Sequence, residues 1–580
     1  MSTLPPFRRR FFGADERFTV MGEGALGGKA TGLELIRRRI LDRLDPAEAP
    51  GITVDVPTLT VLSTELFDRF MDENDLWPVA LEGLPDDRLA LAFQQAELPA
   101  AFVGDLRALA DLVHQPLALR SSSLLEDALH HPFAGVYATK MVPGGQAGAA
   151  DRFRQLVEGV KLIWASAFFA AARRYRERVG VGPRDEKMAV VVQEIVGRRH
   201  GDRFYPALSG VARSHNHYPF GHARPEDGVV NLALGLGRQI VDGGLTWSYS
   251  PAWPASPAPF KTLNDLLKNT QTGFWAVNMG RPPVHDPLRE TEYLLHDELE
   301  TAEEDGVLAP LASTYDPQSG RLRPGLTAAG PRVLDFAPVL RHGALPLNAA
   351  LLRLLALSRE ALEGEVELEF ALTLDPAVRG RARLGVLQLR PMLVSEERVD
   401  IPADLRERPE LLLAADGALG NGVETEIRDV VYLKPAAFDT RHTRSMAAAL
   451  EAVNRRLQEA GRPYLLIGFG RWGSTDEWLG VPVDWSQISG ARVIVEATLP
   501  ELRTDMSQGS HFFHNLISFQ VKYLSVPHDA RPPIDWAWLD ARPAEEESTF
   551  VRWIRTAHPL EVRVDGIGGH AVVMRNARDA

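Results

Sequence analysis

The strongest constraint on the fold is a pair of alternating segments, VELEFALTL at 366–374 and LGVLQLRPML at 384–393. Successive side chains of a strand point to opposite faces of a sheet. Glu367 and Glu369 therefore share one face of the first segment, and the apolar residues between them share the other. We predict a β-hairpin with a long, arginine-containing turn, one face of which packs on a core.

The polar face of this hairpin has the composition of a metal and phosphate site. In the second segment the same alternation places Gln388 and Arg390 on one face. If the strands pair, these two and Glu369 line one wall. Magnesium takes oxygen ligands, which Glu369 and Gln388 supply, and a guanidinium clamps phosphate oxygens in pairs. A solvated sheet face would show the same alternation, so both interpretations stay open here.

The rest of the chain alternates between strand-like and helix-like segments, which predicts an α/β (α+β) protein. Short runs rich in β-branched residues favour strands, and apolar residues at helical spacing favour helices. The clearest strands are expected at 18–21, 187–196 and 491–497, with two more strands on either side of a glycine turn within 228–251. The clearest helices are expected at 28–36, 149–178, 348–364 and 442–460.

The length of the chain and its proline-rich and polar segments indicate several regions. A chain of 580 residues is too long for a single core. The boundaries fall where proline, polar and charged residues gather. We expect a tail at 1–17, a first globular module at 18–395 with an insertion at about 251–345, a linker at 396–410 and a separate α/β domain at 411–580.

Charge and composition exclude several classes of function. The net charge of −13 argues against a broad nucleic-acid or membrane surface, so we expect no such partner. The chain has no cysteine, which excludes disulfides and thiol catalysis and suits a cytoplasmic location. Its N-terminal arginines precede no apolar run, so no secretory signal is expected. The most apolar stretch, within 162–180, is interrupted by arginines and favours an amphipathic helix.

The segment GEGALGGKATG at 22–32 is a glycine-rich entry to a helix. Its spacing satisfies G-x-G-x-x-G, but no acid follows at the end of a second strand, and Ala30 after Lys29 rules out a Walker loop. What remains is a loop whose backbone N–H groups can approach phosphate, with Lys29 beside a helix N-terminus. A helix entry with a solvated lysine fits the segment equally well.

A second segment, LALRSSSLLED at 117–127, combines a helix cap with an unexplained arginine. Ser123 and Glu126 have the spacing of a capping box. The cap does not account for Arg120, which ends an apolar run beside a row of serines. That arrangement suits phosphate binding, because guanidinium pairs with phosphate oxygens. The capping box can fix the loop that aims Arg120.

These segments, in this order, resemble the nucleotide-binding domain of the pyruvate phosphate dikinase and phosphoenolpyruvate synthase family, which has an ATP-grasp fold. The similarity covers about 18–395 apart from the insertion. It rests on a series of motifs: GGKATGLELI, VPTLTVLSTELFDRF, LALRSSSLLEDALHHPFAG, WASAFFAAARRYRERVG, MAVVVQEIV, ALGLGRQIVDGG and VELEFAL with LQLRPM.

The resemblance implies roles for particular residues and two cofactors, ATP and Mg²⁺. The glycine–lysine motif and the arginine–serine loop would hold ATP phosphates, the hairpin would bind magnesium, and the strand at 187–196 would lie near adenine. The residues concerned are Gly27, Gly28, Lys29, Arg120, Ser121 and Ser122 for phosphate; Glu369 and Gln388 for metal; Arg390 as a phosphate clamp; and Gln193 and Glu194 for adenine.

The chain also departs from the family pattern. Asn231 and Arg238 replace glutamates near the glycine turn, and the Glu369–Gln388 connection is longer than usual. No threonine–serine–histidine motif of a phosphohistidine domain is found, and no room remains for a phosphoenolpyruvate barrel. Synthesis of phosphoenolpyruvate by the usual route is therefore not expected of this chain alone.

The C-terminal region offers two weaker candidates for a role in phosphoryl transfer. The loop at 468–480 either binds a polar group or is a structural turn. His511 and His514 lie three apart, on one face if helical, and either could accept a phosphoryl group, although most such histidines are structural.

The resulting hypothesis is an ATP-dependent phosphotransferase with an unidentified small-molecule or protein acceptor. The alternative is an ATP-binding sensor or scaffold that performs no transfer. The sequence does not decide the acceptor, the nucleotide product or the oligomeric state.

Overall fold

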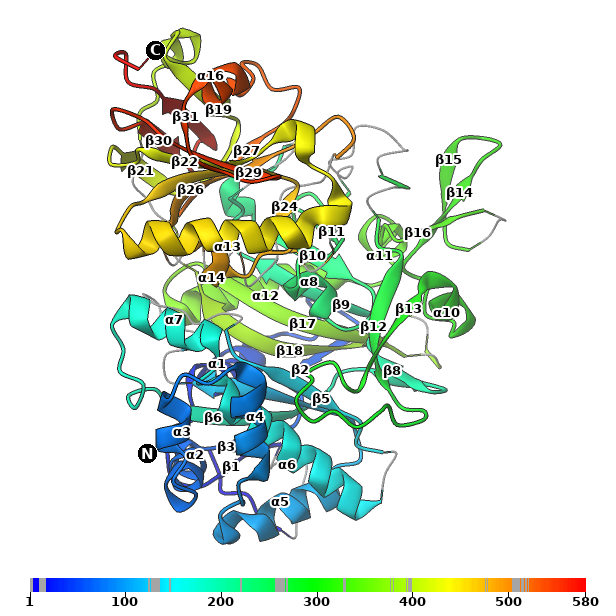
Figure 1. Cartoon of the computed structure of the whole chain (residues 1–580). Helices are drawn as coiled ribbons and strands as arrows, with labels where there is room; N and C mark the ends of the chain where they lie inside the picture. The colour runs from blue at the N-terminus through cyan, green and yellow to red at the C-terminus, as the bar shows by residue number, and fades with distance from the viewer. Residues whose placement is uncertain are drawn as a thin grey trace. The chain divides into compact units, whose positions relative to one another are not determined.

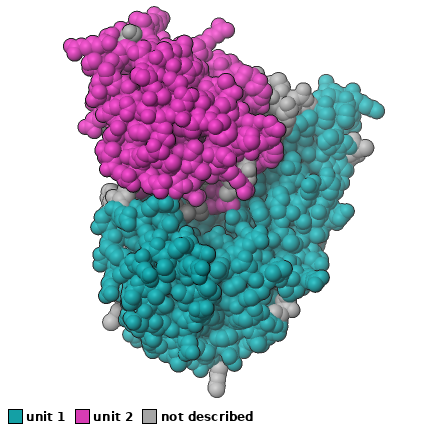
Figure 2. Space-filling model, in the orientation of Figure 1, with its two compact units in different colours: residues 1–214, 229–239, 245–392 teal, residues 215–228, 240–244, 393–580 magenta. Residues whose placement is uncertain are grey.

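The computed structural model forms two compact units, each with its own fold (Figures 1 and 2). Unit 1 comprises 1–214, 229–239 and 245–392, and unit 2 comprises 215–228, 240–244 and 393–580. The structure describes residues 4–9, 17–123, 126, 136–145, 148–217, 219, 222–255, 266–267, 270–326, 330–375, 377–378, 380–392, 394, 399–474, 476, 478–502, 512, 516, 519 and 521–579.

The first sheet of unit 1 carries the two predicted phosphate segments. Its strands run in the order β1-β3-β6-β4-β5. They are β1 (Phe18–Met21), β3 (Leu59–Leu62), β6 (Met188–Glu194), β4 (Leu117–Ser123) and β5 (Thr139–Val142). The strand β4 continues through all three serines, whereas the sequence suggested a strand ending at Arg120. These serines are buried and pair with β6, which extends the ladder.

Helices gather around this sheet because their apolar faces meet an aromatic cluster. They are α2 (Thr64–Glu73), α3 (Trp77–Leu81), α4 (Asp86–Gln95), α5 (Ala100–Leu112), α6 (Ala149–Ser166) and α7 (Ala170–Val179). The rings of Phe70 and Trp164 lie 4.7 Å apart, and Phe67 and Phe168 stack at 6.3 Å. The helix expected at 149–178 is thus two helices separated by a short turn.

Within the described residues, one helical stretch, Ala149–Glu177, is long and apolar enough to cross a membrane by length and composition. Inside the protein, 67% of its most apolar window is buried. This burial is typical of a core helix and agrees with the amphipathic helix expected there.

The second sheet of unit 1 contains the predicted hairpin. Its order is β11-β10-β9-β17-β18-β2. The strands are β2 (Ile52–Asp55), β9 (Leu208–Arg213), β10 (Val229–Ala233), β11 (Trp247–Tyr249), β17 (Val366–Leu374) and β18 (Ala382–Pro391). Helices α1 (Gly28–Leu35) and α12 (Leu347–Leu362) contribute to the same hydrophobic core. A short helix, α8 (Arg238–Val241), follows β10.

The region 251–345, expected to consist of loops, contains regular elements. The strand β12 (Gly273–Asn278) pairs with β8 (Arg203–Tyr205) and β13 (Leu294–Glu298) in a sheet that also contains β7 (Arg198–His200). A three-stranded sheet and two helices follow: β14 (Ser313–Asp316), β15 (Arg321–Pro324), β16 (Arg332–Val333), α10 (Leu299–Glu304) and α11 (Ala337–Leu340). The proline and polar residues of this region gave no alternating pattern, so the sequence did not predict these short strands.

Unit 2 is built on a seven-stranded sheet of order β20-β27-β26-β23-β22-β29-β28. Four strands are largely buried: β22 (Asp429–Leu433), β23 (Tyr464–Phe469), β26 (Ala491–Ala497) and β27 (Lys522–Val526). The others are β20 (Gly417–Leu419), β28 (Ala544–Glu547) and β29 (Val551–Arg555). The predicted helix at 442–460 is α13 (Thr443–Glu459), which runs along this sheet (Figure 1).

A second sheet of unit 2 joins its first and last strands, in the order β19-β31-β30-β21. These are β19 (Leu411–Ala415), β21 (Asn421–Glu424), β30 (Glu561–Asp565) and β31 (His570–Met574). The remaining short elements are β24 (Arg471–Trp472), β25 (Gly480–Val481), α14 (Trp485–Ile488) and α16 (Trp536–Ala541). Both units are mixed α/β structures, which confirms the predicted fold class.

Candidate active site

The hairpin β17–β18 pairs in the register that places its polar residues together. Glu369 lies opposite Gln388, and Glu367 lies opposite Arg390. The next pair joins Phe370 to Val386, so Leu387 is an extra residue that forms a β-bulge. A bulge bends its strand and removes a carbonyl from the regular ladder. The alternation in the sequence predicted the shared face, but not this irregularity.

Arg120 links the first sheet of unit 1 to the polar face of the hairpin. Its Nη1 donates to the carbonyl of Leu387 in the bulge at 2.7 Å. Its Nη2 donates to Glu369 Oε2 at 2.9 Å and to Gln388 Oε1 at 2.7 Å. The side chains of Arg120 and Glu369 are only 14% and 11% exposed. Since solvent screens them little, the ion pair is stronger than one on the surface.

A second, deeper cluster surrounds Glu367 on the same face. Glu367 accepts bonds from Arg390 Nε at 2.7 Å and from Arg213 Nε at 2.6 Å. Arg213 also donates to Asn231, whose amide nitrogen donates to Ser248 at 2.6 Å. All of these residues except Ser248 are buried. Arg390 is therefore held by a carboxylate, and Asn231, a departure from the family pattern, belongs to this network.

The glycine-rich loop is held by the start of helix α2, which follows it by about forty residues. Three consecutive loop N–H groups donate to side chains there: Glu23 to Glu65 (2.7 Å), Gly24 to Ser63 (3.2 Å) and Ala25 to Thr64 (3.0 Å). We expected a loop whose N–H groups can approach phosphate, and these three N–H groups are instead engaged by side chains of unit 1. Ser63 is the residue before α2, yet its side chain holds the loop instead of capping its own helix.

The N–H groups at the start of helix α1 remain open in the described part of the chain. Ala30 donates to Ser122 Oγ at 3.2 Å, and no described group accepts from the N–H groups of Gly27, Gly28 or Lys29. The first N–H groups of a helix have no partner within it and favour an anion. Gly27 has φ of 76°, and a Cβ there would lie 1.8 Å from the carbonyl oxygen of Ser122. Only glycine permits this approach.

Lys29 extends across the end of β4 and is paired with Glu126. Its Nζ donates to the carbonyl of Ser121 at 3.1 Å, to the hydroxyl of Ser121 at 3.2 Å and to the carboxylate of Glu126. The predicted capping box is present: Ser123 N–H donates to Glu126 at 3.2 Å, and Glu126 N–H donates to Ser123 Oγ at 3.1 Å. The sequence identified this cap, but gave no sign that its glutamate also contacts Lys29.

A buried carboxyl lies beneath the serine row. Glu186 accepts a hydrogen bond from Tyr137 and another from Arg176 Nη1 at 3.0 Å. Burial raises the pKa of Glu186 to about 8, and a hydrogen bond from Ser123 opposes this rise. Glu186 thus supports the loop from the protein interior.

The strand expected near adenine brings a buried amide to the sheet. Gln193 lies between Leu59 and Ala118 in the ladder and is 2% exposed. Among the described residues, no group accepts a hydrogen bond from its Nε2. Burying an amide nitrogen without a hydrogen-bond acceptor is energetically costly. A bound ligand could supply the acceptor for Gln193 Nε2. Glu194 follows at the end of β6 and is half-buried.

The candidates in unit 2 have different outcomes. His511 and His514 lie outside the described residues, so their role stays a prediction. In the loop 468–480, Arg471 is buried and donates to the carbonyls of Gly243 at 3.1 Å and Gly244 at 3.0 Å. Ser474 donates to Gly243 at 3.3 Å. These bonds within unit 2 favour the structural interpretation of the loop.

The hairpin oxygens suit a small hard cation. Glu369 and Gln388 each direct one oxygen to the same cationic nitrogen of Arg120, so both already converge on one positive charge. Carboxylate and amide oxygens are donors that Mg²⁺ accepts. The two predicted metal ligands therefore fit the ion, which would neutralise phosphate charge when bound.

Comparison with known proteins agrees with this arrangement. The family described as pyruvate phosphate dikinase, AMP/ATP-binding domain, matches residues 23–408, more than half of the chain. The chain belongs to this family. The match confirms the resemblance drawn from the motifs and supports nucleotide binding by this part of the dikinase-family chain.

Two relatives match shorter stretches. A phosphoenolpyruvate synthase of Aeropyrum pernix is 30% identical over 244 residues, which are 38% of this chain and 26% of that protein. A rifampicin phosphotransferase of Streptomyces sviceus is 29% identical over 210 residues, which are 33% of this chain and 22% of that protein. The match thus spans about a quarter of these curated relatives, both of which are named for phosphoryl chemistry.

Proposed function

We propose that the chain is an ATP-dependent, magnesium-requiring phosphotransferase of the dikinase type, with an ATP-grasp cleft in unit 1. The observation that carries this proposal is the convergence of Glu369 and Gln388 on Arg120. Phosphoryl transfer requires chiefly positioning and charge neutralisation. The oxygens of Glu369 and Gln388 can position a metal ion, and the guanidinium of Arg120 can neutralise phosphate charge.

Each predicted residue has a role in this proposal. Lys29 and Arg120 bind phosphate oxygens, together with the open N–H groups of Gly27 and Gly28, and Glu369 and Gln388 hold magnesium. Further contacts come from a second group: Ser121 and Ser122 at the end of β4, Gln193 and Glu194 near adenine, and Arg390, which orders Glu367 and helps to clamp phosphate.

Unit 2 would bind the phosphoryl acceptor or carry the phosphoryl group, for which His511 or His514 is the candidate. The names of the two relatives associate this type of domain with small-molecule acceptors. The acceptor of this chain belongs to the same broad class in our proposal, or is a partner protein. The absence of cysteine is consistent with a cytoplasmic enzyme.

The deciding experiment follows ATP labelled separately at the β and γ phosphates. Purified protein is incubated with magnesium and either label, and products and intact mass are measured. Release of AMP with an acid-labile phosphoprotein supports dikinase chemistry. Saturable ATP binding without consumption, both for the pure chain and with cell extract added, would contradict transfer and leave the sensor function.

Variants tie the reaction to the site. Lys29→Ala and Glu369→Ala should lower ATP turnover by about 100-fold or more, because the first removes a positive charge that faces phosphate and the second removes a magnesium ligand. The matched control is Glu82→Gln, a change at an exposed residue in unit 1. Unchanged turnover in both active-site variants would contradict the assignment.

A further inference from the structure

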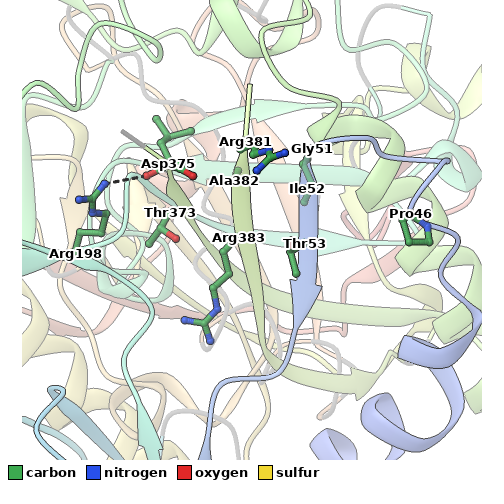
Figure 3. A pocket seen from close by; sticks show the side chains of 11 residues that line it. Pro46, Gly51, Ile52, Thr53, Arg198, Thr373, Asp375, Arg381, Ala382 and Arg383 are labelled. Atoms are coloured by element: carbon green, nitrogen blue, oxygen red, sulfur yellow. Dashed lines mark hydrogen bonds between the residues drawn. The ribbon is translucent and has the colours of Figure 1, made fainter. Parts of the chain in front are cut away.

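A pocket of about 530 Å³ lies in unit 1 at the turn end of the hairpin (Figure 3). It is formed by the ends of β17 and β18, by β2 and by Arg198 at the start of β7. Asp375 and Arg381 line it at the two described ends of the hairpin connection, whose length departs from the family. The pocket therefore belongs to a feature that the family resemblance does not explain.

The pocket is separate from the proposed phosphate site. Thr373, on its wall, follows Glu369 by four residues in the same strand, a separation of about 13 Å at 3.3 Å per residue. Between them the hairpin is closed by a tight contact. A Cβ on Gly385 would lie 2.5 Å from Val196 and 3.2 Å from Pro57.

Three arginines face this pocket, and their charges are only partly compensated. Arg383 is neutralised by Asp55 at 3.0 Å. Arg198 makes a long bond of 3.4 Å to the carbonyl of Leu374, and no described group pairs with the side chain of Arg381. Arg198 and Arg381 are both exposed at this pocket, and their guanidinium groups can donate hydrogen bonds to a bound anion.

The lining carries three arginines against one acid, Asp375, so it keeps an excess of positive charge. The carboxylate of Asp375 accepts from the N–H of Ala377 at 2.9 Å. In the described part of the chain it makes no ion pair. A local positive field in a chain of net charge −13 concentrates small anions at this point.

The remaining lining indicates the kind of anion. The pocket has the volume of a small-molecule site. Thr53 and Thr373 offer hydroxyl groups, whereas Ile52 and Leu374 offer apolar surface. Guanidinium pairs with phosphate oxygens in a fixed fork, and the carboxylate of Asp375 can accept from a ligand hydroxyl. We infer that this pocket binds a small organic phosphate that carries hydroxyl groups, at a site distinct from the nucleotide.

The test measures binding of glycerol 3-phosphate and of inorganic phosphate to the full chain by calorimetry, with and without a saturating non-hydrolysable ATP analogue. Glycerol 3-phosphate should bind in both conditions, and more tightly than inorganic phosphate. Arg381→Ala and Arg198→Ala should each weaken binding about tenfold or more, and Arg381→Glu should abolish it.

The matched control is Arg88→Ala, which removes an exposed arginine from helix α4 of the same unit and should leave binding unchanged. Unaltered thermal unfolding shows that the variants are folded. Absence of binding up to about 10 mM, a Kd weaker than is useful for a metabolite, would overturn the inference. So would loss of binding in Lys29→Ala or in the presence of the ATP analogue, because either result places the phosphate in the nucleotide site. The outcome does not depend on whether the chain transfers phosphate.

Discussion

Lys29 and Glu126 form a pair whose energy depends on burial. The lysine side chain is 12% exposed and the glutamate 3%, so neither is well solvated. Removing one partner of a buried pair leaves an uncompensated charge, at a cost of about 3 kcal/mol or more. An ATP phosphate at Lys29 would supply the missing negative charge. In the proposed function, the pair would therefore couple the stability of unit 1 to occupation of the phosphate site.

The substitution Glu126→Gln tests this coupling. The amide preserves the size of the side chain and can still accept from Ser123, but it cannot neutralise Lys29. We expect a lower unfolding temperature without ATP and a larger rise on addition of magnesium and ATP than in the unsubstituted protein. Differential scanning fluorimetry measures both. Glu82→Gln is the control, and equal ATP-induced shifts in all three proteins would contradict the role of Glu126.

For individual residues, the sequence predicted contacts between near neighbours in the chain better than contacts between distant segments. Alternation placed Glu369 and Gln388 on one face, and three-residue spacing identified the Ser123–Glu126 cap. Neither pattern contains information about contacts between distant segments. The bonds from Arg120 to Leu387 and from Lys29 to Glu126 were therefore not predicted, because each spans about a hundred residues or more.

The glycine loop and helix α1 act together as one element of the site. The loop is fastened to α2, and the first turn of α1 lies against the carbonyl of Ser122 in β4. This arrangement positions the open N–H groups of Gly27 and Gly28 beside the end of the serine row. A change that moves the start of α1 should therefore weaken phosphate binding without touching a charged residue.

The substitution Gly27→Ala should have this effect. Two costs add: alanine at φ of 76° costs about 1 kcal/mol, and its Cβ collides with the backbone of Ser122. We expect reduced stability and ATP affinity weakened about tenfold. Gly83→Ala isolates the first cost, since Gly83 has φ of 82° and nothing within 4 Å of the added Cβ. Chemical denaturation and ATP titration compare the two, and equal effects would rule out the collision.

Elements with strong periodicity were predicted closely, and those formed by packing were not. The helix at 442–460 and the strand ARVIVEA occur as expected, because each contains enough apolar residues to define its period. The short strands at 251–345 have no such period. They form because β12 pairs with β8, which lies some seventy residues earlier in the chain.

Among the described residues, two large hydrophobic cores, one in each unit, share no residue. The first extends from Leu4 to Leu389 and belongs to unit 1, and the second extends from Leu412 to Val573 and belongs to unit 2. Cooperative unfolding usually follows the boundaries of such cores. A ligand that binds to one unit should thus raise the unfolding temperature of that unit and leave the other unchanged.

Calorimetry of the full chain should show two unfolding transitions. Magnesium and ATP should raise the temperature of one transition only, because a ligand stabilises the state that binds it. In Lys29→Ala that shift should disappear while the other transition stays in place. A single transition that moves as a whole with ATP would show that the two cores unfold as one.

The path of the chain has a consequence for how unit 2 can be exchanged in evolution or by engineering. Unit 2 takes residues 215–228 and 240–244 from within the region that forms unit 1, in addition to everything after 392. Its Arg471 and Ser474 bond to the second of these inserts. A break after residue 392 would therefore leave both inserts attached to the nucleotide-binding sheets. Gene fusion at that point alone cannot transplant a complete unit 2, because the unit is encoded by three separate stretches of the gene.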